Sequence, residues 1–421
     1  MMHSLILAAS CAALLKAFPG PPCSLDAAGF RTEEPLLAVK PHGRSFEVRN
    51  AGALKMLRLA PGDTVVLAGG EWRDADLQLH AEGTAANPVT VRAAKDVVLT
   101  GRSQAAFTGR YLVVRGLTFR RGAVARDNFV VFRLGNGADD ACDHCVADRL
   151  TIDGYDSAPS GYDTLKIFYM VLIGKEITVA NSFLGNKHNL GTMISHSVPD
   201  RFLFLNNKVS GFAAGRAPSK GDRMLMQLGW SEVGPHPSHS VLMGNTFERD
   251  VGENETVAVK TSDVVIRDNT FRANVGTLNL RSANRVLVAH NVFDGAGQPG
   301  MGGVRIEGGR HWIVNNLFKG LVRPQNYYYW PIAIHVARDE ELREGANDYA
   351  RVKDVVIAGN RFEDDNAPPI AFGIYPDPAR GRTLAPQNVY LLDNDFVRSG
   401  PAPVFYATPG TVVQRGNRIS N

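Results

Sequence analysis

One pattern recurs along the chain, in VLMGNTF (241–247), VVIRDNTF (264–271), VLVAHNVF (286–293) and WIVNNLF (312–318). Each copy is a short apolar run followed by asparagine, one further residue and phenylalanine. Further copies are ITVANSF (177–183), VVIAGNRF (355–362) and VYLLDNDF (389–396). Self-similarity at a regular period is the signature of a repeat architecture, in which each unit buries its apolar face against the next.

The spacing of the asparagines gives the length of one repeat. Between Asn245 and Asn316 the steps are 24, 22 and 25 residues, and the next two are 44 and 34. We interpret 44 as about two turns and 34 as one turn with an inserted loop. The runs are β-branched, without helical periodicity or a leucine-rich LxxLxL framework, which favours a right-handed single-stranded parallel β-helix. Its asparagines then stack from coil to coil, and its phenylalanines stack inside.

The segment 50–72, NAGALKMLRLAPGDTVVLAGGEW, supplies a cover for the first coil. Asn50 can cap a short helix over 51–59 that ends at Pro61 and Gly62, which hides the open sheet edge from solvent. Coils then follow without a linker, so one β-helix domain is expected over 31–421. Residues 1–30 contain a short apolar run and are expected to be a secretory leader, which implies a secreted or periplasmic protein. A merely frayed terminus is the alternative.

Composition narrows the classes of partner. Hydrophobic residues make up 44% and charged residues 21% of the 421 residues, as in ordinary globular proteins. The net charge of +4 comes without a basic block, so we expect neither nucleic-acid nor membrane binding, while an acidic polymer is permitted. Cys142 and Cys145 form a lone CxxC, for which a local disulfide or two thiols is favoured over a zinc site.

The segment GENETVAVKTS (252–262) has the densest chemistry in the chain. Glu253 and Glu255 are two residues apart, so on a strand their carboxylates share a face, with Lys260 soon after. Arg281 follows Lys260 by 21 residues, close to one turn, and the offsets to the next ladder asparagine are 9 and 10. The two cations should therefore lie on neighbouring coils about 5 Å apart, where like-charge repulsion depresses the pKa of the lysine. The alternative is that the glutamates lie in a solvated turn and the two cations form a surface patch without a function, which would show the same sequence pattern.

These residues also resemble a known family. GENETVAVK (252–260), DNTF (268–271) and GTLNLR (276–281) are similar to the signature of the alginate lyase and chondroitinase B family, polysaccharide lyase family six. Its usual form is G-E-x-E-x-x-x-x-K-S, then N-T-F, then G-x-L-x-x-R-H-G. Further matching stretches, in the same order as in the family, are NAGAL (50–54), PGDTVVLAGGEW (61–72), GNKHNLGT (185–192) and GGVRIEGGRHWIVNNLFKGL (302–321).

The resemblance implies roles for individual residues. It makes Lys260 the Brønsted base and Arg281 the acid or charge stabiliser, and it matches Glu253 and Glu255 to calcium-binding glutamates. The candidates in matched motifs for holding the sugar acid are Lys187, Asn189, Arg305 and His311. Lys187 could equally be a rim charge, and His311 a satisfied turn histidine.

Two departures from the family pattern bear on the cofactor. The third calcium ligand of the family is an asparagine, and the corresponding stretch SKGDRMLMQLGWS (219–231) has none. Asp222 could substitute for it, or Lys220 or Arg223 could take over the role of the cation. In addition, the Arg-His pair of the family reads Arg281-Ser282 here. We therefore leave Ca²⁺ open and expect metal dependence to be weaker than the two glutamates suggest.

The expected function is cleavage of an acidic polysaccharide, alginate first, by β-elimination that leaves 4,5-unsaturated uronate ends. A dermatan sulfate lyase of the chondroitinase B type is the alternative substrate class. A β-helical glycoside hydrolase would need paired acids on a repeated coil face, which the sequence lacks. A non-catalytic polysaccharide-binding β-helix would have no need to keep Lys260 and Arg281 in one register, and C5-epimerisation shares their proton abstraction. The mode of attack, endo or exo, and the oligomeric state stay open.

Overall fold

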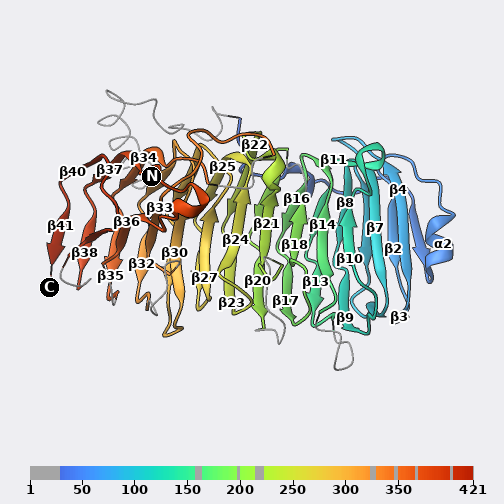
Figure 1. Ribbon diagram of the computed structural model, residues 1–421. Coiled ribbons are helices and arrows are strands. Elements are labelled where there is room, and N and C mark those ends of the chain that lie inside the picture. The colour runs from blue at the N-terminus through green and yellow to red at the C-terminus, as the bar shows by residue number, and fades with distance from the viewer. Residues whose placement is uncertain are drawn as a thin grey trace.

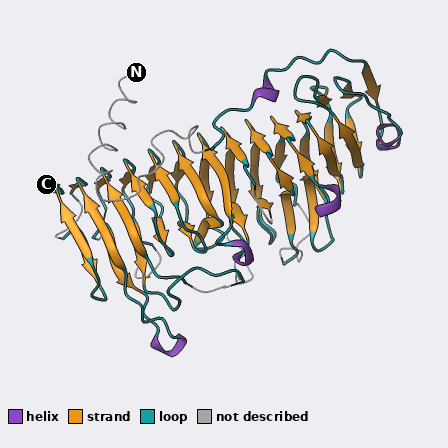
Figure 2. Cartoon of the chain, turned by 90° about the horizontal axis from the view of Figure 1, so that it is seen from above, coloured by secondary structure: helices purple, strands orange, loops and turns teal. Residues whose placement is uncertain are grey.

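The computed structural model describes residues 29–156, 164–196, 200–213, 222–322, 329–345, 349–365, 368–398 and 402–420. Residues 1–28 of the expected leader, and Lys220, lie outside this part of the chain. The described residues form a parallel β-helix of the right-handed type that the repeat predicts, with successive coils stacked into three long parallel sheets (Figure 1). Seen from above, the coils form one row, with the short helices on loops at its edges (Figure 2).

The strands of each sheet follow one another along the axis of the helix. Sheet A consists of β1 (Ser45–Val48), β2 (Thr64–Leu67), β5 (Val89–Ala93), β8 (Leu112–Arg115), β12 (Val146–Asp148), β16 (Thr178–Ala180), β19 (Leu203–Leu205), β22 (Pro237–Met243), β25 (Ser262–Arg267), β28 (Val286–Ala289), β31 (Trp312–Val314), β34 (Lys353–Ala358), β37 (Gln387–Leu392) and β40 (Val412–Arg415). Sheet B consists of β3 (Glu71–Arg73), β6 (Val98–Gly101), β9 (Thr118–Gly122), β13 (Thr151–Asp153), β17 (Phe183–Lys187), β20 (Lys208–Phe212), β23 (Thr246–Asp250), β26 (Thr270–Arg272), β29 (Val292–Asp294), β32 (Leu317–Lys319), β35 (Arg361–Glu363), β38 (Asp395–Val397) and β41 (Arg418–Ser420).

Sheet C carries the candidate site. It consists of β4 (Asp76–Glu82), β7 (Gln104–Arg110), β10 (Phe129–Leu134), β14 (Ile167–Leu172), β18 (Ile194–His196), β21 (Met226–Gly229), β24 (Glu255–Lys260), β27 (Gly276–Leu280), β30 (Met301–Ile306), β33 (Ile332–His335), β36 (Ile370–Ile374) and β39 (Val404–Tyr406), with β11 (Cys142–Asp143) and β15 (Gly174–Lys175) at its margin. The helices are α2 (Ala51–Lys55) and the 3-10 turns η2 (Pro35–Leu37), η3 (Ala138–Asp140), η4 (Ser231–Val233) and η5 (Pro378–Arg380). Within the described residues no helix has the length and apolarity that a membrane crossing requires.

The asparagine ladder predicted from the repeat is confirmed. The side-chain amide of Asn269 donates to Oδ1 of Asn291 at 3.0 Å, and Asn291 donates in the same way to Asn316 at 3.0 Å. The full stack runs through Asn207, Asn245, Asn269, Asn291, Asn316, Asn360, Asn394 and Asn417. Inside the coil, the rings of Phe271 and Phe293 stack with centroids 4.7 Å apart. Buried amides that satisfy one another hold the coils in register.

Two details of the repeat differ from the expectation. Asn316 bonds directly to Asn360 and β31 pairs with β34, so the 44-residue step is one turn with a long insertion rather than two turns. In ITVANSF the ladder position belongs to Ser182, whose backbone N–H donates to Oδ1 of Asn207 at 3.0 Å. The preceding Asn181 has φ 52° at the turn, a left-handed conformation that asparagine tolerates.

The cap over the first coil forms as expected, but it is shorter. Oδ1 of Asn50 accepts a hydrogen bond from the backbone N–H of Ala53 at 2.8 Å, and α2 then ends at Lys55 instead of residue 59. Leu57 and Leu59 lie in a non-helical segment and pack against the core. Burial of these two side chains therefore takes precedence over a further turn of helix.

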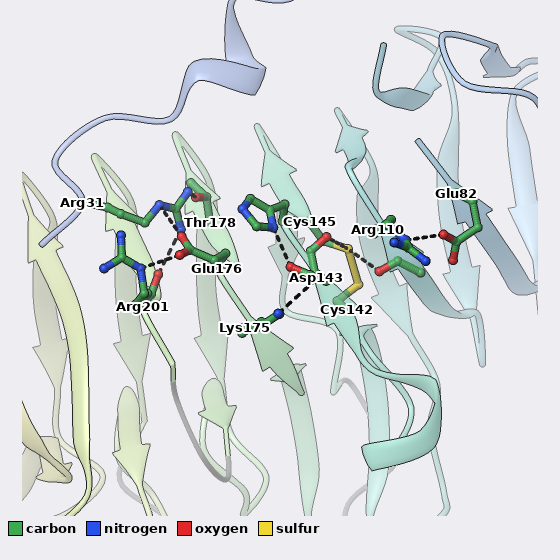
Figure 3. A network of polar contacts seen from close by, with 12 residues as sticks. Arg31, Glu82, Arg110, Cys142, Asp143, Cys145, Lys175, Glu176, Thr178 and Arg201 are labelled. Atoms are coloured by element: carbon green, nitrogen blue, oxygen red, sulfur yellow. Dashed lines mark hydrogen bonds and ion pairs between the residues drawn. A yellow bond between two sulfur atoms is a disulfide. The ribbon is translucent and has the colours of Figure 1, made fainter. Parts of the chain in front are cut away.

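An amino-terminal segment is fastened along the outside of sheet A. Nε of Arg31 lies 3.0 Å from a carboxylate oxygen of Glu176, which also pairs with Arg201 (Figure 3). Close by, Cys142 and Cys145 are joined in a disulfide, the first of the two alternatives considered for the CxxC (Figure 3).

Candidate active site

The candidate site lies on the outer side of sheet C, where β24, β27 and β30 are neighbours (Figure 1). The register pairs Ala258 with Asn279 and Asn279 with Arg305. Two residues further along each strand, the same register brings Lys260, Arg281 and Glu307 opposite one another. The parallel ladder therefore stacks a lysine, an arginine and a glutamate on three successive coils.

Lys260 is the last residue of β24 and is partly buried. Its Nζ donates to Oε1 of Gln227 on β21 at 3.3 Å. Burial lowers the pKa of Lys260 below its ordinary value of 10.5, and the charge of Arg281 lowers it further against the opposing effect of nearby glutamates. The ammonium form is therefore less favoured here than in water, and the neutral amine that a general base needs is easier to reach.

Two arginines share one carboxylate beside Lys260. Oε1 of Glu255 lies 3.6 Å from Nη1 of Arg281 and 3.5 Å from Nη1 of Arg305. The side chain of Arg281 keeps 26% of its surface exposed, whereas that of Arg305 keeps 2%. Arg281 can therefore meet a ligand from solvent, and Arg305 adds positive charge behind it.

A buried ionic cluster supports the arginines. Nη2 of Arg305 lies 2.6 Å from Oε1 of Glu307 and donates to the hydroxyl of Tyr349 at 2.8 Å. Burial raises the pKa of Glu307 to about 7 against the effect of the neighbouring arginines. Arg382 lies over the ring of Tyr349, 4.1 Å from its centroid, and Nδ1 of His335 lies 3.4 Å from Glu307. This cluster orients Arg305 from behind, because each member is held by at least one other.

Of the four residues expected to hold the sugar acid, Arg305 alone joins Lys260 and Arg281. Lys187 ends β17 in sheet B, fully buried, and its Nζ donates to the carbonyl oxygen of Leu190 at 2.7 Å and to that of Asn189. Asn189 is also buried, and its backbone N–H donates to the carboxylate of Asp156 at 2.7 Å. The two residues close a turn inside the coil, which explains why the motif matches without their side chains facing a substrate.

His311 also lies inside the coil. Its Nδ1 accepts a hydrogen bond from the backbone N–H of Val286 at 3.2 Å, and its Nε2 lies 3.1 Å from the carbonyl oxygen of Glu307. Burial lowers the pKa of His311 to about 4, so the ring is neutral at physiological pH. These contacts are those of a histidine that stabilises a turn, which is the alternative to a role in sugar binding.

The burial of Lys187 predicts a pH-dependent stability. Burial lowers its pKa from 10.5 to about 7, so between these values the unfolded chain binds more protons than the folded one. The free energy of unfolding should therefore rise with pH across this window, by up to about 1.4 kcal/mol per pH unit. In Lys187→Met the rise should be smaller, as measured by urea unfolding at several pH values above about 7. Equal slopes for parent and variant would contradict the assignment.

A comparison with protein families now identifies the chain. The model of the chondroitinase B family matches residues 50–391. The chain belongs to the chondroitinase B family. The comparison with curated protein sequences gives no match.

Solved structures of polysaccharide lyases share the fold of this chondroitinase B family member. The alginate lyase AlyGC, of polysaccharide lyase family 6, superposes with a TM-score of 0.78 at 23% identity, covering 89% of this chain and 51% of AlyGC. A mannuronic acid specific family 6 lyase from human gut microbiota gives 0.75 at 21% identity, covering 88% and 82%. A family 6 lyase from Pseudopedobacter saltans gives 0.73 at 21% identity, covering 89% and 92%. The chain thus spans about half the length of AlyGC.

The calcium site that the family resemblance implies does not fit the residues present. Glu255 faces two guanidinium groups, and Asp222 pairs with Lys166 at 3.0 Å, so Asp222 does not join Glu253 and Glu255. Across the part of the chain that the structure describes, no group of three or more His, Cys, Asp or Glu side chains could hold a metal ion. Arg281 and Arg305 supply positive charge beside Glu255.

Arg223, the other residue considered for the role of the cation, lies on the neighbouring coil with its backbone against Gly252, next to Glu253. It is buried, and its charge contributes to lowering the pKa of Lys187. In the described part of the chain, its Nε and Nη2 have no hydrogen-bond partner. Lys220, the remaining candidate, falls outside the described residues.

Sequence reasoning missed much of the cluster behind Arg281. Glu307 could have been found, because it stands two residues after Arg305 in the matched stretch 302–321 and one coil after Arg281. Tyr349 and Arg382 could not, because they lie in insertions between coils, where no period fixes which strand they will approach.

Proposed function

We propose that this chondroitinase B family member is a lyase that cleaves a polysaccharide containing uronic acid by β-elimination. The observation that carries the proposal is the pairing of Lys260 with Arg281 on adjacent strands, where burial and the arginine lower the pKa of the lysine. A base and a fixed cation side by side meet the two needs of this reaction. The hydrogen to be removed is only weakly acidic, and the adjacent carboxylate must be neutralised before a lysine can take it.

In the proposed reaction, the neutral amine of Lys260 removes the proton from the sugar carbon next to the carboxylate. The electron pair of that C–H bond moves into the carboxylate, whose developing charge Arg281 stabilises. Return of the pair forms the carbon–carbon double bond and breaks the bond to the glycosidic oxygen. That oxygen takes a proton from Arg281. Lys260 then releases its proton to solvent and Arg281 takes one from solvent, so both groups return to their starting states. One product has a new non-reducing end that carries a 4,5-unsaturated uronate. The other has a new reducing end, whose hydroxyl group keeps the glycosidic oxygen.

The fixed positive charge of two arginines supports this assignment for acidic sugars. Arg281 is accessible, and Arg305 behind it is held by Glu307 and Tyr349, so both guanidinium groups are already oriented before substrate arrives. Preorganised cations of this kind stabilise an anionic intermediate more than mobile ones, since they need no reorganisation during the reaction. The arrangement favours a uronate over a neutral sugar.

A platform for the sugar ring lies next to the base. Trp230 follows Gly229, the residue paired with Lys260, and exposes 49% of its surface. An exposed indole can stack against the apolar face of a pyranose ring. We propose that Trp230 borders the subsite in which the reacting uronate sits.

Alginate is the first substrate that we propose, since structurally similar proteins include alginate lyases and one described as specific for mannuronic acid. Dermatan sulfate is the alternative, because the family model is that of chondroitinase B. Purified protein should be incubated with alginate blocks, dermatan sulfate, chondroitin sulfate and pectate while the ultraviolet absorbance of unsaturated uronate is followed. Absorbance that rises with at least one uronan supports lyase activity. Binding without any rise on all of them would favour a non-catalytic polysaccharide-binding protein.

The same assay tests the cofactor. We expect the initial rate to be unchanged, within about twofold, when the protein is dialysed against a chelator, because arginines occupy the position beside Glu255. Activity that the chelator abolishes and added calcium restores would contradict this expectation. In that case Glu253, Glu255 and Asp222 would be replaced one at a time to find the ligands.

We propose export to the periplasm or the medium, where the acidic polysaccharide would be encountered. The Cys142–Cys145 disulfide supports this location, because disulfides persist in oxidising compartments. Fractionation of the natural host cells would test it, and enrichment of the protein in the cytosol would contradict it.

A further inference from the structure

A pocket opens on sheet C, near the amino-terminal end of the β-helix. It has a volume of about 460 Å³ and is lined by residues at the end of α2 and on β4, β7 and β10. Figure 1 shows these elements near one another at the amino-terminal end of the β-helix. We call it the amino-terminal pocket, and its polar lining includes Arg58, Asp76, His80, Gln104, Arg126 and Arg133. It shares no lining residue with the site around Lys260.

The cations of this pocket form no ion pair with its acids in the described part of the chain. Among the described residues, no ion pair is formed by Lys55, Arg58, Arg126 or Arg133, all of which line it. Arginines elsewhere on the coils are paired from rung to rung, as Arg285 is with Asp263 at 2.7 Å. A solvated face of the usual kind would show such pairs here too.

The acids of the pocket are already engaged. Asp76 accepts hydrogen bonds from the side-chain amides of Gln78 at 2.7 Å and Gln104 at 3.0 Å. Asp140 lies 3.5 Å from Nδ1 of His80. Neither carboxylate is within ion-pair distance of an arginine in the described structure, and the lining has more lysine and arginine side chains than aspartates, so its net charge is positive.

Arg133 lies at the centre of this charge. Its guanidinium donates to Oδ1 of Asn136 at 2.9 Å, and it is partly buried. Burial lowers the pKa of Arg133, and the nearby charge of Arg126 lowers it further against the opposing charge of Asp76. Two guanidinium groups held near one another repel, and an anion between them relieves that repulsion.

The pocket and the candidate active site lie on one wall. The register of sheet C pairs Arg133 with Val171, Val171 with Ser195, and Ser195 with Gln227, the residue that contacts Lys260. Lys260 itself lies on the next strand, β24, so strand spacing places it roughly 20 Å from Arg133 along the helix axis. One extended polymer can therefore follow this row and reach both sites.

We propose that the amino-terminal pocket is a second binding site for uronate carboxylates, which holds a distant part of the same acidic polysaccharide while Lys260 acts on it. The identity of the ligand in this inference rests on the proposed function, whereas the location of the site rests on the pocket. Two linked contacts raise the affinity for a long chain well beyond that for a short one. The pocket thus selects for polymer length.

The test is a pair of substitutions, Arg126→Gln with Arg133→Gln, in the full chain. A matched control is Arg92→Gln with Arg415→Gln, which removes the same number of charges from sheet A. Each protein is assayed on purified oligouronates of increasing length and on polymer. We expect the pocket variant to raise KM for polymer by about tenfold or more, with kcat unchanged and with trimers cleaved at the parental kcat/KM. The control should behave like the parent.

Direct binding separates this inference from the proposed function. The pocket substitutions are combined with Lys260→Ala, and oligouronate affinity is measured by calorimetry. Loss of affinity for long oligomers, with short ones unaffected, supports the second site even if no uronan is cleaved. Equal polymer affinity and KM in pocket variant and parent would overturn it, and so would an equal loss in the sheet A control, which would indicate a general charge effect. If the parent cleaves no uronan, the proposed function fails by itself.

Discussion

Lys260→Ala should lower the rate of uronan cleavage by about 10² to 10⁴-fold while leaving the fold intact. The register places this side chain beside Arg281 on the adjacent strand, and burial lowers its pKa, which makes the neutral amine easier to reach. It is partly exposed at the end of β24, so its truncation opens no core cavity, and the loss of stability should stay within about 0.5 kcal/mol. Catalysis and folding should therefore separate at this residue.

Two further variants sharpen the test of Lys260. Lys260→Arg keeps the charge, but a guanidinium is almost entirely protonated in the resting enzyme, so hardly any neutral base is present and the variant should be as inactive as the alanine variant. Lys319→Ala removes an exposed lysine from sheet B and should retain full activity. The readouts are the initial rate of ultraviolet absorbance and the melting temperature. A Lys260→Ala protein that melts like the parent and cleaves at a similar rate would show that another group is the base.

Arg281→Ala should cost a comparable factor, about 10² to 10³ in kcat, because it removes a preorganised donor from the developing carboxylate charge. Glu255 keeps Arg305 as a partner, so no buried carboxylate is left without a cation and the fold should survive. Arg281→Lys should recover little of the rate, since an ammonium does not offer the two-pronged geometry of a guanidinium.

The matched control for Arg281 is Arg285→Ala, four residues further along. Arg285 pairs with Asp263 at 2.7 Å on the outside of the helix. Its loss should lower the free energy of unfolding by at most about 1 kcal/mol and leave the activity unchanged. Equal loss of activity in the Arg281 and Arg285 variants would mean that the effect is structural. The assignment of Arg281 to the reaction would then be wrong.

Sequence alone predicts the position of Lys260 relative to Arg281 because the asparagine ladder marks the same point on each coil. Ladder residues such as Asn269 and Asn291 are buried and bonded to one another, so counting from them places any residue of the same coil. The count fails where chain is inserted. The 44-residue step is one turn with a long insertion, which the count mistakes for two turns. The inserted chain carries Tyr349 to Arg305, and this contact depends on packing between coils rather than on the repeat period.

Motif matches do not say which way a side chain points. Lys187 and His311 stand in matched stretches, yet both are buried and bonded to backbone inside the coil. Their contacts show that these turns need a hydrogen-bond donor or acceptor at that place. Asp222 shows the same limit, because its pairing with Lys166 depends on a contact across coils that the sequence does not display.

The central claim is that the chain breaks a glycosidic bond by elimination and not by hydrolysis. The most direct measurement is mass spectrometry of the fragments released from a uronan in water labelled with heavy oxygen. We predict fragments whose new non-reducing ends carry an unsaturated uronate, lighter by one water than a hydrolysis product, with no labelled oxygen introduced by bond cleavage. Saturated ends accompanied by labelled oxygen at the cleaved bond would contradict the account and indicate a glycoside hydrolase.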